Sequence, residues 1–336
     1  MLKAKGEDTM KRKLMIIAAV CIVAGAAMAG IGWSMGGTGF NISARDGLQF
    51  ISDMTEYTYT DMDMEEFSAV TIDVYDCPVY IHRANDGKYG VDVSMYLPES
   101  DKDKVELKVE KGELILKASR SPFNLNLSWN FDFTGDREGH IDIYLPEKEY
   151  NDIYVCTSNA RIEVEDLDVG DNKLTADTSN GNISLLNVNS GKLLADTSNA
   201  KVTIENSFFD EVVVDTSNGV VQLDKVEAES FDVKSSNASI IFDKVYGNTA
   251  KLDTSNGKVI LTTIHFAKKL EVETSNAAIE LLLDGQREDY TLSADTSNSS
   301  IYVDGDKTDD DFSGGKGDAK VKLDTSNGKI TVEFAQ

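Results

Sequence analysis

Apolar and polar residues alternate along most of the chain after residue 67, and a short polar motif interrupts the alternation at regular intervals. Around one such motif the apolar positions are Leu174, Ala176, Ile183 and Leu185. Side chains at every second position of a strand point to the same face. The pattern therefore predicts one short strand on each side of the motif, each strand with one buried face.

The interrupting motif is Ser-Asn followed by one small residue, and it occurs nine times at spacings of 19 to 29 residues. A recurring spacing of this size is typical of stacked repeats, in which each unit covers its neighbour. The commonest spacing, 19 residues, leaves no room for a helix beside two strands. We therefore predict an all-β fold, a parallel β-solenoid (β-helix) of about 19-residue coils with a rise of roughly 4.8 Å per coil. The motif asparagines are Asn159, Asn180, Asn199, Asn218, Asn237, Asn256, Asn276, Asn298 and Asn327.

The phase of the alternation assigns the motif residues to faces. The Thr two positions before the Asn, such as Thr178, is in register with the buried positions, and so is the Asn itself. Because a buried amide needs hydrogen-bond partners, we expect the nine Asn side chains to form a structural ladder inside the corner. The next residue is Gly, Ala or Ser, which indicates that the corner requires a small volume.

The residue three positions before each Asn is expected on the outer face. Carboxylates one strand spacing apart repel each other unless they are hydrogen-bonded, interrupted or neutralised. Either each Asp accepts hydrogen bonds from nearby Ser, Thr or corner amide groups, or the column binds divalent cations. We take Asp177, Asp196 and Asp215 as a candidate partner surface. The full column is Cys156, Asp177, Asp196, Asp215, Lys234, Asp253, Glu273, Asp295 and Asp324.

The N-terminal segment predicts membrane attachment. Residues 14–37 are apolar or small throughout and follow a basic tail, residues 1–13. A stretch of this length spans a bilayer, and the basic flank places the tail in the cytoplasm. The alternative is a cleaved signal peptide, because Ala27-Met28-Ala29 resembles a cleavage site. The apolar run extends past it to an interfacial Trp33, which favours an uncleaved transmembrane helix. Both interpretations export the rest of the chain.

The remaining chain divides into three parts: a stalk at residues 38–66, irregular β capping coils at 67–155, and the regular solenoid repeats at 156–336. One loop near residue 130 carries alternating aromatic residues. This face either covers the open end of the solenoid or docks a partner. Its candidate residues are Phe123, Trp129, Phe131 and Phe133.

The composition and the charge of the chain limit the classes of function that it can have. The chain has a net charge of −25, and residues 1–13 carry five basic and two acidic groups, which leaves −28 on the exported part. Such a surface repels nucleic acids. The three His residues lie apart in the sequence, so we expect structural roles for them, and we predict no metal and no cofactor. The sequence contains no phosphate-binding loop and no activated-serine motif, so we expect a protein that is not an enzyme.

The repeat units Asp-Thr-Ser-Asn-Gly and Asp-Thr-Ser-Asn-Ala, the Leu145-Pro146 pair, the turn at residues 110–114 and the N-terminal anchor resemble the bacterial β-strand-repeat family of putative adhesins, whose function is unknown. The resemblance covers roughly residues 65–336. It implies a solenoid on the outer side of a Gram-positive cell membrane, in some members encoded beside cell-envelope stress systems. It implies no catalytic or ligand-binding residues.

We expect a single-pass membrane protein with a cytoplasmic N-terminus and an extracytoplasmic C-terminal solenoid. Its expected function is binding or scaffolding at the cell envelope, in adhesion or in envelope-stress sensing. The expected partners are the membrane, through the anchor, and an envelope protein, a glycan or a cationic peptide. The alternative is a carbohydrate-active enzyme on a β-helix scaffold, which needs a carboxylate and a basic residue clustered on one face.

Overall fold

The computed structural model describes residues 39–43, 47–51, 54–118, 129–132 and 139–335. The chain falls into two units. One consists of Met1–Glu56, Tyr96–Lys102 and Ser121–Arg137, and the other of Tyr57–Met95, Asp103–Arg120 and Glu138–Gln336. Within the described part of the chain no helix is long and apolar enough to cross a membrane. The expected transmembrane segment lies outside the described residues.

The first unit contains a three-stranded antiparallel sheet of order β2-β1-β9. Strand β1 (Gly39–Ser43) pairs with β2 (Gly47–Ile51) on one edge and with β9 (Trp129–Asp132) on the other. Part of the expected stalk is therefore a strand that pairs with the aromatic segment. Trp129 and Phe131 belong to β9, whereas Phe123 and Phe133 lie outside the described residues.

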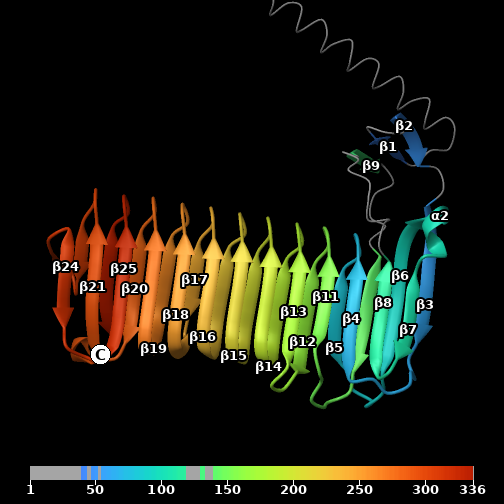
Figure 1. The fold of residues 1–336 in the computed structure, drawn as a ribbon, viewed down its shortest axis with the longest axis horizontal. Helices are drawn as coiled ribbons and strands as arrows, with labels where there is room; N and C mark the ends of the chain where they lie inside the picture. Colours follow the sequence, from blue (N-terminus) through green and yellow to red (C-terminus); the bar gives the residue numbers. More distant parts are fainter. Residues whose placement is uncertain (1–38, 44–46, 52–53, 119–128, 133–138, 336) are drawn as a thin grey trace, which may run out of the picture. The chain divides into compact units, whose positions relative to one another are not determined.

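The second unit is a parallel β-solenoid (Figure 1), as the repeat predicts. Neighbouring coils pair residue for residue, so that Leu174 lies opposite Leu193 and Leu193 opposite Val212. The long strands bend and run along three successive sides of the solenoid. The strands of the regular coils are β13 (Lys173–Thr178), β14 (Ile183–Thr197), β15 (Val202–Thr216), β16 (Val221–Ser235), β17 (Ile240–Asp243), β18 (Tyr246–Thr254), β19 (Val259–Thr274) and β20 (Ile279–Asp284).

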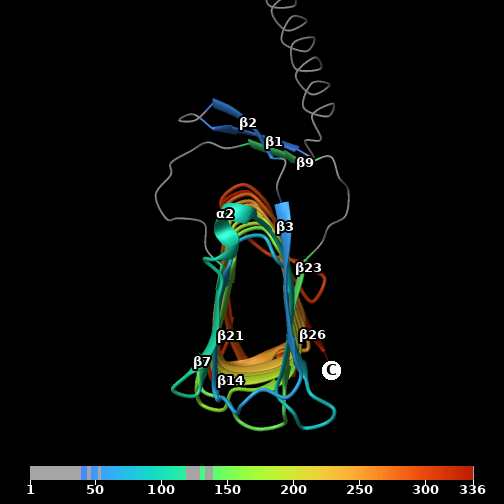
Figure 2. The same cartoon turned by 90° about the vertical axis from the view of Figure 1, so that its right-hand side faces the viewer.

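Each coil has two long sides and a short third side, which the end-on view shows (Figure 2). Side A holds the segment before the Ser-Asn corner, such as residues 193–197, and side B holds the segment after it, such as 202–206. The third side, such as residues 207–211, leads back to side A of the next coil. The corner between side B and the third side has a left-handed residue in successive coils, with φ between 50° and 54°, at Asp166, Asn187, Asn206, Lys225, Lys244 and Thr263.

The core follows the predicted alternation. Leu174, Ala176, Ile183 and Leu185 are fully buried, and the other inward positions of the coils are likewise filled by Val, Ile, Leu and Phe. Burial of these side chains on both long sides drives the stacking, because no coil can cover its own apolar face. The Thr two positions before the Asn is also buried, with 0 to 1% exposure at Thr178, Thr197 and Thr254.

The predicted inward orientation of the Asn is wrong. Asn159, Asn180 and the other seven motif asparagines are exposed at the outside of the corner. The strand ends at the Thr, and the backbone bends at the Ser and the Asn. Period-two alternation holds only while the backbone is extended, so the phase cannot be continued through the bend.

At the C-terminal end the coils do not stack in chain order. Strands β25 (Ala319–Thr325) and β26 (Ile330–Ala335) lie between the coil of β19 and β20 and the coil of β21 (Tyr290–Thr296) and β22 (Ile301–Val303). Strand β24 (Asp311–Gly315) pairs antiparallel with β21 on the outer edge. The acidic segment before residue 320 thus contains an edge strand that covers the end of the solenoid, and it is more than a loop.

The N-terminal end has the same construction. Strands β4 (Ala69–Val74) and β5 (Val79–Arg83) lie between the coil of β11 (Ile153–Thr157) and β12 (Ile162–Asp168) and the coil of β8 (Glu113–Ala118) and β10 (His140–Leu145).

Antiparallel strands close this end as well. Strand β7 (Glu106–Glu110) pairs with β8, and β6 (Gly90–Pro98) pairs with β10. Strand β3 (Met54–Asp61), from the expected stalk, pairs with β6, and the four-residue helix α2 (Glu99–Lys102) follows β6.

Candidate functional site

The motif asparagines form a continuous ladder along the outside of the corner. Each Asn Nδ2 donates to the Oδ1 of the Asn in the neighbouring coil, at 2.6 to 2.9 Å. The ladder follows the spatial order of the coils, so Asn327 lies between Asn276 and Asn298. At the N-terminal end Asn159 donates to the carboxylate of Asp76. All the amide dipoles therefore point the same way, and their positive ends face an anion.

The inside of the same corner is a second column of hydrogen bonds. In one coil Thr254 Oγ1 accepts from the N–H of Gly257 at 3.1 Å and donates to the carbonyl of Ala238 in the previous coil at 3.3 Å. A Cβ added to Gly257 would lie 1.8 Å from that carbonyl oxygen. The small residue after the Asn is therefore required by a close approach between coils, as the sequence predicts.

The acidic column lies on the outer face of side A, as expected. Asp177, Asp196 and Asp215 stand opposite one another in successive coils. Burial raises the pKa of Asp177, and burial together with the charges of Asp177 and Asp215 raises the pKa of Asp196. None of the three carboxylates has a hydrogen bond or an ion pair within the described part of the chain. The expected bonds to corner groups are therefore missing, and the only basic neighbour described along the column is Lys234, which stands opposite Asp215 in the next coil.

An apolar column runs beside these carboxylates. Two positions earlier on the same strands, Tyr154, Leu194 and Val213 point outward, with Thr175 between the first two. Tyr154 is 37% exposed. Side A thus presents a row of charge roughly 7 Å from a row of apolar groups. We call the following seven residues the side A stripe: Tyr154, Thr175, Asp177, Leu194, Asp196, Val213 and Asp215.

Side B offers a direct comparison. Glu205, Asp224 and Asp243 also stand opposite one another on its outer face. There the carboxylate of Asp224 lies 3.6 Å from Lys225 Nζ, and that of Asp243 lies 3.0 Å from Lys244 Nζ. Two of the three charges on side B are therefore paired locally, whereas on side A Asp177 and Asp196 have no basic neighbour among the described residues of the column and Asp215 faces Lys234 in the next coil.

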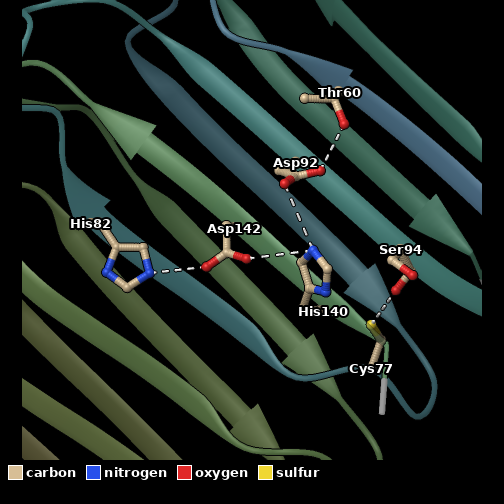
Figure 3. A network of polar contacts seen from close by, with 7 residues as sticks. All are labelled: Thr60, Cys77, His82, Asp92, Ser94, His140 and Asp142. Atoms are coloured by element: carbon tan, nitrogen blue, oxygen red, sulfur yellow. Dashed lines mark hydrogen bonds and ion pairs between the residues drawn. The ribbon is translucent and has the colours of Figure 1, made fainter. Parts of the chain in front are cut away.

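A cluster of His and Asp lies on the outer face near the N-terminal end (Figure 3). His82 Nε2 is 3.0 Å from Asp142 Oδ1, and His140 Nε2 is 3.8 Å from Asp92 and 3.9 Å from Asp142. Asp92 also accepts from Thr60 Oγ1 at 2.8 Å. The expectation that the His residues are isolated is wrong for His82 and His140, because β5, β6 and β10 bring them together.

The side chains of this cluster do not amount to a metal centre. Among the described residues no group of three His, Cys, Asp or Glu side chains is arranged to hold a metal ion. The third His, His265, bonds through Nδ1 to the buried hydroxyl of Tyr290 at 2.9 Å, which is a structural contact.

Cys77 and Cys156, the two cysteines among the described residues, are free thiols. Cys77 is buried below the His and Asp cluster, where its Sγ lies 3.6 Å from the carbonyl of Ser94. Burial, with the charges of Asp142 and Asp76, raises the pKa of Cys77 to about 12. Cys156 lies in the outer column between Asp73 and Asp177, and burial raises its pKa as well. Both thiols are therefore poor nucleophiles.

A family model, Toastrack DUF4097, matches residues 67–333. The chain belongs to this family. The matched region spans the capping and regular coils, which agrees with the resemblance to putative adhesins found in the repeat units. No curated protein matches the chain.

Solved structures similar to this Toastrack chain include proteins from Parabacteroides and Bacteroides. A protein described as a putative lipid binding protein from Parabacteroides distasonis is 14% identical, with 83% of this chain and 97% of that chain covered and a TM-score of 0.49. A putative adhesin from Bacteroides fragilis is 13% identical, with coverage of 83% and 97% and a TM-score of 0.44. A putative adhesin from Parabacteroides merdae is 14% identical, with coverage of 84% and 97% and a TM-score of 0.40.

Proposed function

We propose that the chain is a membrane-anchored extracytoplasmic binding module, which acts at the cell envelope by binding a partner and not by catalysis. The solenoid supplies a rigid surface, because both its inner and its outer corner are hydrogen-bonded from coil to coil. The observation that carries the proposal is the row of Asp177, Asp196 and Asp215, in which no carboxylate forms an ion pair with a residue that the structure describes and only Asp215 has a basic neighbour, Lys234. Ionised groups that repel one another are stabilised by a cationic partner, which removes the repulsion.

The partner that fits the side A stripe is a basic amphipathic helix. Basic residues three or four positions apart in a helix rise roughly 5 Å along its axis, which matches the roughly 4.8 Å between coils. A helix lying along the solenoid axis can therefore place one basic residue against each Asp. An apolar row beside its basic row contacts Tyr154, Leu194 and Val213, where the buried area supplies affinity.

The test is calorimetric titration of the full chain in zwitterionic lipid nanodiscs with a designed helix of Lys and Leu in this pattern. We expect the variant with Asp177→Asn, Asp196→Asn and Asp215→Asn to lose at least about tenfold in affinity. The matched control has Glu205→Gln, Asp224→Asn and Asp243→Asn, removes the same charge from side B, and keeps the affinity within about twofold. Equal losses in both variants, or no binding by wild type at low salt, would disprove the proposal for side A.

The anchor is tested separately. We propose that residues 14–37 stay attached and hold the solenoid outside the membrane, because the apolar run extends past Ala29. Protease added to intact protoplasts should then digest the solenoid, and mass spectrometry of the membrane fraction should recover the original N-terminus. A mature N-terminus at Gly30 would instead show a cleaved signal peptide.

A further inference from the structure

The third side of the solenoid has a hollow of about 300 Å³ near its N-terminal end. It lies where the segment after β10, the end of β12 and the bend of β14 come together. Its volume is at the lower end of the range of small-molecule sites, roughly 300 to 1,000 Å³. Side A and the His and Asp cluster contribute no residue to it.

The charged groups around the hollow are unevenly compensated. Arg83 forms an ion pair with Glu147, and Lys148 Nζ lies 2.8 Å from Glu66. Both basic groups are therefore engaged. Glu149, Asp166 and Asp168, which also line the hollow, have no basic partner in the part of the chain that the structure describes. The hollow therefore presents acceptor oxygens and rejects anions.

Two amides add donors to these acceptors. Asn187 Nδ2 donates to Asp166 Oδ1 at 2.8 Å, so its carbonyl oxygen remains open. The Asn189 side chain makes no hydrogen bond within the described residues. Planar carboxylate and amide groups side by side offer paired acceptors and donors, which is the arrangement that neighbouring hydroxyl groups need.

An exposed aromatic ring lies next to these polar groups. Asp168 stands opposite Asn189, and Asn189 opposite Phe208 in the next coil, roughly 4.8 Å away. Phe208 is 54% exposed, the largest exposed fraction among the big apolar side chains described. Along the third side, Phe208 stands opposite Glu227 in the next coil, and Glu227 stands opposite Tyr246 in the coil after that. Asp168 accepts one hydrogen bond, from the N–H of Gly170 at 3.0 Å, and keeps further acceptor positions open. An apolar ring beside polar groups with open hydrogen-bonding positions marks a binding surface.

We propose that the hollow and Phe208 form a binding site for a saccharide without negative charge. One face of a sugar ring carries C–H groups, which pack against Phe208, while hydroxyls at the ring edge reach Asn189, Asp168 and Glu149. An apolar ligand would leave the carboxylates unsatisfied, and an acidic sugar would be repelled by them. The site goes beyond the proposed function, because it lies on the third side and uses no residue of the side A stripe.

The test is calorimetric titration of the full chain, kept in a detergent without a sugar headgroup. Three probes separate the chemistry: a trimer of N-acetylglucosamine, which is neutral, a trimer of glucosamine, which is cationic, and a trimer of galacturonic acid, which is anionic. We expect the first two to bind and the third not to bind. No binding by either non-acidic trimer, or equal binding by all three, would overturn the proposal.

Variants locate the site. Phe208→Ala should weaken binding at least about tenfold, and Phe208→Trp should retain it, because the larger ring preserves the stacking surface. Ile241→Ala removes an outward apolar side chain from side B and is the matched control, with unchanged affinity. Because Phe208 is exposed, the melting temperature of its variants should match wild type. Unchanged sugar binding in Phe208→Ala would show that the site lies elsewhere.

Discussion

The inside and the outside of the Ser-Asn corner are both columns of hydrogen bonds, but only one of them is shielded from water. Inside, Thr254 is fully buried and its hydroxyl links the N–H of Gly257 to the carbonyl of Ala238. Outside, Asn256 is exposed between Asn237 and Asn276, at 2.9 and 2.8 Å. Water can replace a lost bond only outside. The inner column should therefore contribute more than the outer column to the free energy of unfolding. The outer column is nevertheless the one that the repeated Asn makes most visible in the sequence.

The largest effect is expected from Gly257→Ala. The added Cβ meets the backbone of Ala238, which cannot move without separating two coils. We expect a loss of at least about 3 kcal/mol in the free energy of unfolding, measured by thermal melting of the full chain. The control is Ala238→Gly in the previous coil, which adds no atom and should cost only about 1 kcal/mol. Similar losses of stability in the two variants would contradict the close approach between Gly257 and the Ala238 carbonyl.

A smaller effect is expected from Thr254→Val, which keeps the volume and removes the hydroxyl. The N–H of Gly257 then loses its partner in a buried place, at a cost of about 1–3 kcal/mol. Thr254→Ser keeps the hydroxyl and is the control. Denaturant titration measures both. The prediction is contradicted if the Thr254→Val variant is as stable as wild type.

Asn256→Ala should cost less, about 1 kcal/mol, because water reaches the two ladder partners that it leaves. A loss larger than that of Thr254→Val, in the same titration, would mean that the ordered amides support one another along the ladder more strongly than the buried hydroxyls do.

Asp196→Asn should change stability least and in the opposite direction. The raised pKa means that the folded chain holds this proton more tightly than the unfolded chain, so ionisation at neutral pH is unfavourable for folding. The variant should therefore melt at a higher temperature than wild type at pH 7. As the pH falls through the raised pKa, the difference should shrink, and it should vanish below the ordinary aspartate pKa of about 3.9. A difference in melting temperature that grows as the pH falls would contradict this prediction.

The repeat predicts the strands, their buried positions and the small residue at the corner, because all of these depend on neighbours in the same or the next coil. It predicts the inward Thr but not the outward Asn, since the orientation of the Asn depends on where the backbone bends. The inserted coils are also missed, because their pairings join residues that lie far apart in the sequence. The cluster of His82 and His140 is missed for the same reason.

One signal in the motif does indicate the insertion. In spatial order the residues after the Asn alternate between Ala and Gly, from Ala238 to Gly257 to Ala277 to Gly328. In chain order Ser299 interrupts this alternation. Each Gly approaches an Ala carbonyl of the coil before it, and Gly328 approaches Ala277. The chemistry of the corner therefore identifies the neighbour of each coil more reliably than its place in the sequence does.

Strands β25 and β26 leave the ribosome after β19 to β22, yet they lie between these earlier coils. Coils cannot therefore be added at this end in the order of translation, as an ordinary repeat array permits. The coil of β21 and β22 has to wait, or to detach again, until β25 and β26 arrive and fill the gap. Once they do, these two strands are held by pairing on both edges. Pulling them out of the solenoid then has to break the pairing with two neighbouring coils together.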